Sequence, residues 1–329
     1  MFDRIYIEER AKAYPLTSEV LKALKRSFED DGVIPIRHYK DVFNRRNQDI
    51  AVQKDSPSLI LAVREGSLVY RGAKVCQSFG NEHFYYTSCV MNCLYDCEYC
   101  YLQGMYPSAN IVVFVNYEDI FDAVRDLLAQ FPVYLCISYD SDLLAMESWL
   151  GMVHRWAAFV RENKDLTVEL RTKSAAFDRI SDIEPCDRFV LAWTVSPEDI
   201  AKKYEHRAPQ TAARLACAAR ALEKGFPVRL CLDPMLNTRG FEEAYGGLIE
   251  QAAALFDMSK LKDVSLGVFR ISSEYLASMR RQRPDSAVVN YPYVTRDGVC
   301  SLDEARERQM TDFVREKLAK HIAEDRIWI

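Results

Sequence analysis

The chain has 329 residues, of which 49% are hydrophobic and 28% are charged, and its formal net charge at pH 7 is -5. A chain of this length can bury one large hydrophobic core or two smaller ones. Its composition does not fit a disordered protein or a membrane protein. The acidic balance argues against non-specific nucleic-acid binding but leaves room for a local basic face.

The first residues, MFDRIYIEERAKAYP, are charged and contain no apolar core, so they do not resemble a signal peptide. No stretch approaches the roughly 18 consecutive apolar residues of a membrane-spanning helix. We therefore expect a cytoplasmic protein, in which the scattered cysteines are reduced and mostly buried. These scattered cysteines are Cys76, Cys136, Cys186, Cys217, Cys231 and Cys300.

Two segments near the N-terminus show regular patterns. Residues 16–29 have the apolar spacing of a helix, and residues 56–72 predict two short strands around a Glu-Gly turn. The next recognisable strand is FYYTS, at 84–88.

From residue 84 onward, strands and helices are predicted to alternate, as in crossover units of a parallel sheet. Further strands are expected at 132–138, 166–172, 187–195, 226–234 and 263–271, and an extended segment at 110–115. Helices are expected at 117–131, 142–163, 197–204, 208–225 and 240–256.

About six such units are too few for a closed eight-stranded barrel, so the expected fold is α/β, a partial (β/α)6 TIM-type barrel. We expect an N-terminal extension over 1–80, a barrel core over 81–271 and a C-terminal segment over 272–329. In such folds the chemistry lies beyond the C-terminal ends of the strands.

Four cysteines lie within twelve residues: Cys89, Cys93, Cys97 and Cys100. The spacing Cys93-x3-Cys97-x2-Cys100 allows three thiolates to hold three irons of a 4Fe–4S cluster and to leave the fourth iron open. An electron-transfer protein normally closes that position with a fourth cysteine. The alternative is zinc, but structural zinc sites usually combine two separated pairs, and no second pair exists here. Cys89 is then either a small packed residue or a spare thiol near the site.

This spacing, followed directly by Tyr101 and placed after a strand, resembles the radical S-adenosylmethionine (SAM) superfamily. In that superfamily the open iron chelates SAM, and the reduced cluster cleaves it to a 5′-deoxyadenosyl radical. The segment CEYCYLQGMYPSANIVVFVNYEDIF resembles the spore photoproduct lyase family more closely. The similarity continues through SDLLAMESW, LRTKS, WTVSPEDIAKKYEHRAPQTAARLACAARALEKGFPV and RGFEEAY, and covers roughly residues 80–270.

The resemblance implies a DNA repair lyase that acts on spore photoproduct, a methylene-bridged thymine dimer formed by ultraviolet light. In the family, the adenosyl radical removes a hydrogen from the lesion, the bridge breaks, and the remaining thymine radical must regain a hydrogen atom. The implied cofactors are a 4Fe–4S cluster and SAM. The implied partners are ultraviolet-damaged DNA and an electron donor such as flavodoxin or ferredoxin.

The resemblance also assigns roles to individual residues. Cys93, Cys97 and Cys100 take the cluster positions. Ser141, Lys173 and Thr194 fall where the family binds SAM, and each follows or ends a predicted strand; capping of the strand end is the alternative for Ser141 and Thr194. Tyr99 and Tyr101 match two loop tyrosines that relay a hydrogen atom, with aromatic packing as the alternative.

One position departs from the family pattern. The family carries a hydrogen-donating cysteine directly before its Thr-Ser-Asp segment, and aligning residues 140–142 with that segment puts Tyr139 there. The nearest cysteine, Cys136, lies three residues earlier, and an odd offset on an extended strand points to the other face. Three alternatives follow. The hydrogen donor is Tyr139, alone or with Tyr99; or it is a cysteine, Cys136, Cys89 or Cys76; or the protein is a member of the family that acts on a different substrate.

DNA-contacting residues are less clearly marked. Arg270, Arg280, Arg281, Arg283 and the aromatic stretch at 290–294 could contact phosphates and bases, or form ordinary surface. Two alternatives to the lyase remain open: an enzyme of the same family with a different substrate, and a non-enzymatic metal-binding module.

Overall fold

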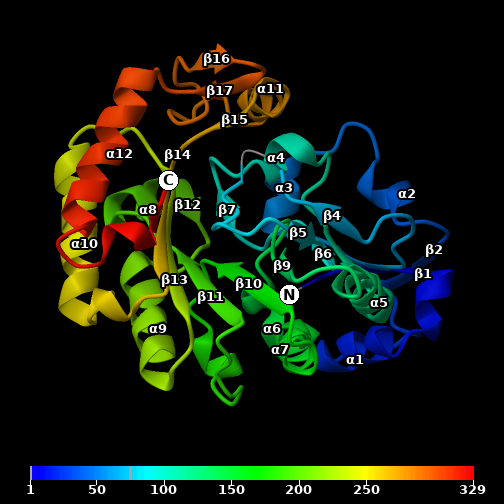
Figure 1. The fold of residues 1–329 in the computed structure, drawn as a ribbon. Coiled ribbons are helices and arrows are strands. Elements are labelled where there is room, and N and C mark those ends of the chain that lie inside the picture. Colours follow the sequence, from blue (N-terminus) through cyan, green and yellow to red (C-terminus); the bar gives the residue numbers. More distant parts are fainter. Residues whose placement is uncertain (1, 74–75) are drawn as a thin grey trace. The chain divides into compact units, whose positions relative to one another are not determined.

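A computed structural model describes residues 2–73 and 76–329, and Figure 1 labels its elements along the chain. The chain divides into two compact units. The first comprises residues 1–73, 80–94 and 105–170, and the second comprises residues 74–79, 95–104 and 171–329. The division at residues 80 and 271 that the sequence predicts remains a prediction.

The first unit contains a five-stranded sheet that the sequence did not predict. Its strand order is β2–β1–β3–β8–β6, and all neighbours are parallel except β6, which is antiparallel to β8. Its strands are β1 (Ile5–Glu8), β2 (Val33–Ile36), β3 (Leu59–Ala62), β6 (Val90–Met91) and β8 (Ile111–Phe114). β1, β3 and β8 are fully buried and apolar apart from Glu8, as expected for central parallel strands.

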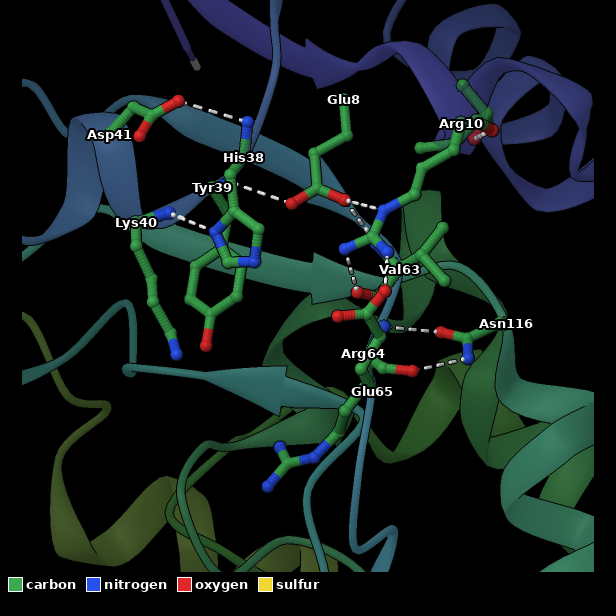
Figure 2. A network of polar contacts seen from close by, with 12 residues as sticks. Glu8, Arg10, His38, Tyr39, Lys40, Asp41, Val63, Arg64, Glu65 and Asn116 are labelled. Carbon is green, nitrogen blue, oxygen red and sulfur yellow. Dashed lines mark hydrogen bonds and ion pairs between the residues drawn. The ribbon is translucent and has the colours of Figure 1, made fainter.

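Figure 2 shows how the loops at the carboxyl ends of these strands are held. The Glu8 carboxylate is fully buried; it accepts the backbone N–H groups of Tyr39 (2.7 Å) and Val63 (3.0 Å) and pairs with the Arg10 guanidinium. Asn116 accepts the backbone N–H of Arg64 at 2.8 Å and donates to its carbonyl at 3.0 Å. Four loops from different strands are thereby fixed at one edge of the sheet.

A second group of strands in the first unit leads toward the predicted site. β4 (Val69–Arg71) is antiparallel to β5 (Phe84–Thr87), β5 is parallel to β9 (Val133–Cys136), and β9 is parallel to β10 (Leu166–Thr172). The two strands predicted around the Glu-Gly turn are confirmed as β3 and β4. They belong to different sheets, however, because β3 pairs with β1 and β8 whereas β4 pairs with β5.

The helices of the first unit differ from the prediction in two places. The first predicted helix ends early, at Ala23 of α1 (Pro15–Ala23), and Lys25 adopts a positive φ of 56°. The helix predicted over 142–163 is two helices, α6 (Leu143–Leu150) and α7 (Met152–Glu162), because Gly151 between them has φ 66°. The remaining helices of this unit are η1 (Glu9–Ala13), α2 (Lys40–Phe43), α3 (Ile50–Asp55) and α5 (Tyr117–Leu128).

The second unit is built on parallel strands β11 (Phe189–Thr194), β13 (Val228–Met235) and β14 (Asp263–Val268), with β18 (Ile327–Trp328) parallel to β14. The helices of this part are α8 (Glu198–Tyr204), α9 (Thr211–Lys224), α10 (Phe241–Leu255) and α12 (Glu304–Leu318). α9 contacts β11 and β13, α12 contacts β14, and α10 packs against α9 and α12 (Figure 1). α9 ends at Gly225, with φ 99°, as the sequence predicts.

Smaller elements complete the second unit. β7 (Asp96–Cys97) is antiparallel to β12 (Glu205–His206), and α4 (Leu102–Met105) begins in the same cysteine-containing loop. A three-stranded antiparallel sheet and a helix follow β14: β15 (Ile271–Ser272), α11 (Ser273–Gln282), β16 (Val294–Arg296) and β17 (Val299–Ser301). The short helices are η2 (Phe177–Ile180), η3 (Met258–Lys260) and η4 (Glu324–Arg326).

The alternation of parallel strands with helices confirms the predicted α/β class. None of the sheets over residues 2–73 and 76–329 closes on itself. Within the same residues, the helices are too short or too polar for any of them to span a membrane. Four of the six scattered cysteines are buried, as expected, whereas Cys76 and Cys186 are partly exposed.

Candidate functional site

The chain passes from the first unit to the second inside the cysteine region. Cys89 and Cys93 belong to the first unit, and Cys97 and Cys100 belong to the second. Among the residues that the structure describes, no three His, Cys, Asp or Glu side chains are grouped as a metal site. The cluster ligands therefore stay a prediction, and the two sets of residues are described separately.

In the first unit, the backbone at Cys93 is held by two side chains. Ser141 donates its hydroxyl to the carbonyl of Asn92 at 2.8 Å, and the buried Lys54 donates its ammonium to the carbonyl of Cys93 at 2.9 Å. Asn92 has φ 70°, and its side-chain amide donates to two carbonyl groups of the 108–110 loop at 2.8 Å each. Ser141 is thus placed directly beside the cysteine loop.

The turn that carries Ser141, residues 139–142, is fixed by its two aspartates. The buried Asp140 carboxylate accepts the hydroxyl of Ser88 and bonds to that of Tyr106. Burial, and then the nearby Asp140 charge, raise the pKa of Tyr106 well above its ordinary value. Asp142 caps the first turn of α6. Both predicted site residues in this turn therefore sit on an ordered backbone.

The side chains of Tyr139 and Cys136 lie toward the same face of the sheet, although the three-residue offset between them predicted opposite faces. β9 ends at Cys136, so the alternation of faces does not extend to Tyr139. The Tyr139 ring stacks on Tyr86, with centroids 4.2 Å apart, and Tyr86 is the cross-strand partner of Cys136. Cys136 is buried within the strand, whereas Tyr139 is partly exposed beyond its end.

Cys89 has the environment of a packing residue. Its side chain is 1% exposed, and burial raises the pKa of its thiol to about 12. The protonated thiol is then the stable form at neutral pH, and only a thiolate binds metal well. Of the two interpretations that the sequence left open for Cys89, the geometry favours the packed residue.

In the second unit, the cysteine loop is tied to α11. Gln103 donates its side-chain amide to the carbonyl of Cys97, and its own side-chain oxygen accepts Arg283 at 2.6 Å. Arg283 also pairs with the Asp96 carboxylate. A Cβ on Gly104 would lie 2.6 Å from the backbone oxygen of Tyr275, so this contact with α11 requires glycine.

Three of the four arginines considered for DNA contacts make hydrogen bonds or ion pairs within this unit. Arg283 holds the cysteine loop as described, and Arg280 donates to the carbonyls of Val289 (2.8 Å) and Tyr291 (2.9 Å). Arg270 pairs with Asp233 at 3.0 Å. Arg281 is exposed. In the 290–294 stretch, Tyr293 packs on Phe269, with ring centroids 5.2 Å apart.

A buried polar network lies behind the cysteine loop and centres on Glu205. Its carboxylate accepts the hydroxyls of Tyr99 and Ser196, the latter at 2.8 Å, and pairs with Arg214. The side chains of Glu205 and Arg214 are both fully buried. Glu205 also pairs with Cys97 across the β7–β12 ladder, so the network is built onto a predicted cluster ligand.

Lys173 and Thr194 adjoin this network. Lys173 directly follows β10, and its ammonium lies 5.3 Å from the centroid of the Tyr99 ring. Thr194 is the last residue of β11, and its backbone carbonyl accepts a hydrogen bond from Arg214 at 3.3 Å. Burial alone would lower the pKa of Lys173, but the Cys97 sulfur and the Glu205 carboxylate raise it overall. Burial likewise opposes the charge of Glu205, yet Lys173 and Arg214 hold the pKa of that carboxyl below its ordinary value.

The sequence did not single out Glu205, Arg214, Lys54 or Asn92. Glu205 and Arg214 fall inside the YEHRAPQTAAR stretch that carried the family resemblance, but nothing in their spacing indicates a shared buried pair. Tyr101, which the resemblance paired with Tyr99, is partly exposed, whereas Tyr99 is buried.

The network predicts a specific acid sensitivity. Because the folded pKa of Glu205 is depressed, its stabilising contribution is present above the ordinary value of 4.5 and is lost as pH falls below it. We expect the free energy of unfolding of Glu205→Gln to fall less steeply below pH 4.5 than that of the wild type, by at most about 1.4 kcal/mol per pH unit. Urea titrations between pH 3 and pH 7 measure this slope, and parallel slopes would contradict the prediction.

Comparisons with known proteins identify the family to which the chain belongs. A family model described as "Spore photoproduct lyase" matches residues 1–281. Spore photoproduct lyase of Bacillus subtilis is 23% identical over 316 residues, covering 92% of this chain and 85% of the relative. That of Clostridium acetobutylicum is 23% identical over 292 residues, covering 86% of this chain and 81% of the relative.

Solved structures show the same fold. A spore photoproduct lyase complexed with dinucleoside spore photoproduct superposes with a TM-score of 0.83 at 17% identity, covering 100% of this chain and 98% of the other. A mutant of such a lyase with bound AdoMet and dinucleoside spore photoproduct gives a TM-score of 0.82 at 17% identity, with the same coverage. Because the family model spans most of the sequence, the chain belongs to the spore photoproduct lyase family.

Proposed function

We propose that this chain is a radical SAM lyase that cleaves spore photoproduct in ultraviolet-damaged DNA back to two thymines. The observation that carries the proposal is the family match over residues 1–281, which includes the whole cysteine loop and its buried supports. A methylene-bridged dimer stacks poorly in a duplex, so moving it into an enzyme pocket costs less than moving a normal base pair.

We propose that Cys93, Cys97 and Cys100 hold a 4Fe–4S cluster. The chemistry of the second unit fits such a group, because the partly exposed Lys173 lies near the Cys97 and Cys100 sulfurs and a nearby cation favours the thiolate form that binds iron. When bound, the cluster together with SAM supplies the 5′-deoxyadenosyl radical of this superfamily. The residues of the chain then orient the cofactor and exclude water.

The proposed SAM-binding residues are Ser141, Lys173 and Thr194. A lysine ammonium suits a carboxylate, and hydroxyls suit a carboxylate or a ribose. Tyr99 and Tyr101 are the proposed hydrogen relay. Tyr139 and Cys136 are the first candidates for the donor to the product radical, and Cys89 and Cys76 are the other cysteines considered.

Replacing Lys173 by methionine is expected to weaken SAM binding. Loss of one hydrogen bond to a charged group removes about 1.5–3 kcal/mol, or roughly 10- to 100-fold in Kd. Anaerobic equilibrium binding of SAM to the reconstituted protein measures the effect. Lys202→Met, at an exposed position on α8, is the matched control and should bind SAM as the wild type does.

The wider architecture is proposed on the same basis. The chain is a partial (β/α)6 TIM-type barrel, with an N-terminal extension over 1–80, a core over 81–271 and a C-terminal segment over 272–329. The enzyme works in the cytoplasm and receives its electron from a donor such as flavodoxin or ferredoxin.

Anaerobic reconstitution tests the function directly. The reduced protein is incubated with SAM and dinucleoside spore photoproduct, and the products are separated. Appearance of thymidylyl-thymidine supports the lyase, and binding of lesion-bearing duplex that weakens with salt supports the DNA substrate. Formation of 5′-deoxyadenosine without thymine would instead show that the substrate assignment is wrong.

One observation favours a second candidate function, a radical SAM enzyme of this family with a different substrate. Tyr139 stands where the family carries its donor cysteine, and a different donor is compatible with a different product radical. A third alternative, a non-enzymatic module, predicts one tightly bound zinc and no cleavage of SAM under dithionite.

A further inference from the structure

We propose that Tyr139 is the hydrogen-atom donor of this chain, and that Tyr86 is a positioning residue that holds the Tyr139 ring. The inference rests on the proposed function, because it names the group that returns a hydrogen atom to the product radical. Tyr86 lies on β5, outside the cysteine loop and outside the SAM-binding segments.

Three tyrosine rings form one continuous stack in the first unit. The Tyr139 and Tyr86 rings are stacked with centroids 4.2 Å apart at an interplanar angle of 25°. Tyr86 and Tyr70 are stacked at 5.3 Å and 22°, and they are direct partners in the antiparallel β4–β5 pair. Stacking on Tyr86 restricts how the Tyr139 ring can turn, so the position of its hydroxyl oxygen is restricted.

The far end of the stack is anchored by Arg64. The Tyr70 hydroxyl donates to the carbonyl of Ser67 at 2.6 Å and accepts the Arg64 guanidinium at 2.9 Å. That guanidinium lies 5.3 Å from the centroid of the Tyr70 ring. The backbone of Arg64 is held on both sides by Asn116, as Figure 2 shows. The stack therefore has one fixed end and one end at the terminus of β9.

Position distinguishes Tyr139 from Cys136 as the donor. Tyr139 lies in the turn beyond the C-terminal end of β9, two residues before Ser141, where parallel α/β folds place their chemistry. Cys136 is the last residue inside that strand and is 6% exposed. A donor must reach its substrate, and of the two only Tyr139 is partly exposed at the strand end.

The step itself exchanges one hydrogen atom. The O–H bond of Tyr139 breaks, a C–H bond forms at the methylene carbon of the thymine radical, and Tyr139 is left as a neutral phenoxyl radical. No net charge moves. The O–H bond is restored when a hydrogen atom returns from the methyl carbon of 5′-deoxyadenosine through the proposed relay of Tyr99 and Tyr101. The C–H bond at that carbon breaks, and the 5′-deoxyadenosyl radical is left.

The test uses the exchangeable hydrogen of the phenol. Reconstituted enzyme equilibrated in D2O carries O–D at Tyr139, so a single turnover of spore photoproduct is expected to place one deuterium in a thymine methyl group. Tyr139→Phe is expected to lose this label entirely, whereas Cys136→Ala keeps it. The melting temperature of Tyr139→Phe, measured alongside, shows whether the variant is folded.

Tyr86 is tested by a pair of variants. Tyr86→Leu removes the stacking ring and is expected to lower the yield of labelled thymine by about tenfold or more, since small misplacement of a reacting group is costly. Tyr86→Phe keeps the ring and should restore the yield. Tyr85→Phe is the control, because Tyr85 points to the opposite face of β5 and packs on Phe131. If Tyr86→Phe is as impaired as Tyr86→Leu, positioning by stacking is wrong.

Freeze-quench electron paramagnetic resonance gives a readout independent of yield. The wild type is expected to show a tyrosyl radical during turnover, and Tyr139→Phe is expected to lose that signal. Wild-type repair without methyl deuterium, or label that survives in Tyr139→Phe, would overturn the inference alone. Absence of any thymine product from the wild type would overturn the proposed function and the inference with it.

Discussion

Replacing Cys97 by alanine is expected to abolish the iron–sulfur absorbance of the reconstituted protein and to reduce SAM cleavage to background. The reason is the number of proposed ligands: three thiolates would hold three irons, and with one thiolate removed the cluster is not expected to be retained. Cys93→Ala and Cys100→Ala should behave in the same way. Iron and sulfide content, visible absorption and 5′-deoxyadenosine yield under dithionite measure the loss.

Cys89→Ala is the matched control for these variants, because it removes the fourth cysteine of the same region. The Cys89 side chain is 1% exposed, and burial raises the pKa of its thiol to about 12, so it is a poor source of thiolate. We expect Cys89→Ala to keep its iron and its SAM cleavage, with a loss of stability of about 1 kcal/mol from the core. Loss of iron in this variant would point to a four-cysteine site, and zinc in the wild-type protein would favour the non-enzymatic module.

The cysteine loop could be predicted from the sequence because its signal is local. Cys93, Cys97 and Cys100 lie within eight residues, so their spacing alone limits what they can bind. The strand–helix order was also predictable, since the apolar pattern of each segment depends on near neighbours. The break at Gly151 was missed. The apolar spacing is helical on both sides of this glycine, so the sequence predicted one helix where the structure has α6 and α7.

Pairings between distant segments could not be predicted in this way. β8 follows the cysteine loop in the chain, yet it pairs with β3 of the N-terminal part. Nothing in the residues of either strand indicates which strand lies next to it in the sheet. The contact of Glu205 with Tyr99 joins residues 106 positions apart, across a two-residue ladder. Periodicity reports which face of an element is buried, but not which distant side chain meets it.

The buried pair of Glu205 and Arg214 leads to the largest expected effect on stability. Both side chains are fully buried, and Arg214 also donates to the carbonyls of Pro209 at 2.7 Å and Thr194 at 3.3 Å. Arg214→Met would leave the Glu205 carboxylate buried without its guanidinium. We expect the free energy of unfolding to fall by about 3–5 kcal/mol, the usual cost of removing one partner of a buried ion pair.

The same helix supplies the control. Arg220 lies six residues after Arg214 on α9 and pairs with Asp178, but its side chain is 45% exposed. Exposed ion pairs contribute about 0–1 kcal/mol, so Arg220→Met should change stability little in the same urea titration. A double variant, Glu205→Gln with Arg214→Met, should lose less than the sum of the two single variants, because no charge is then left unpaired. Equal losses for Arg214→Met and Arg220→Met would show that the buried pair does not stabilise this unit.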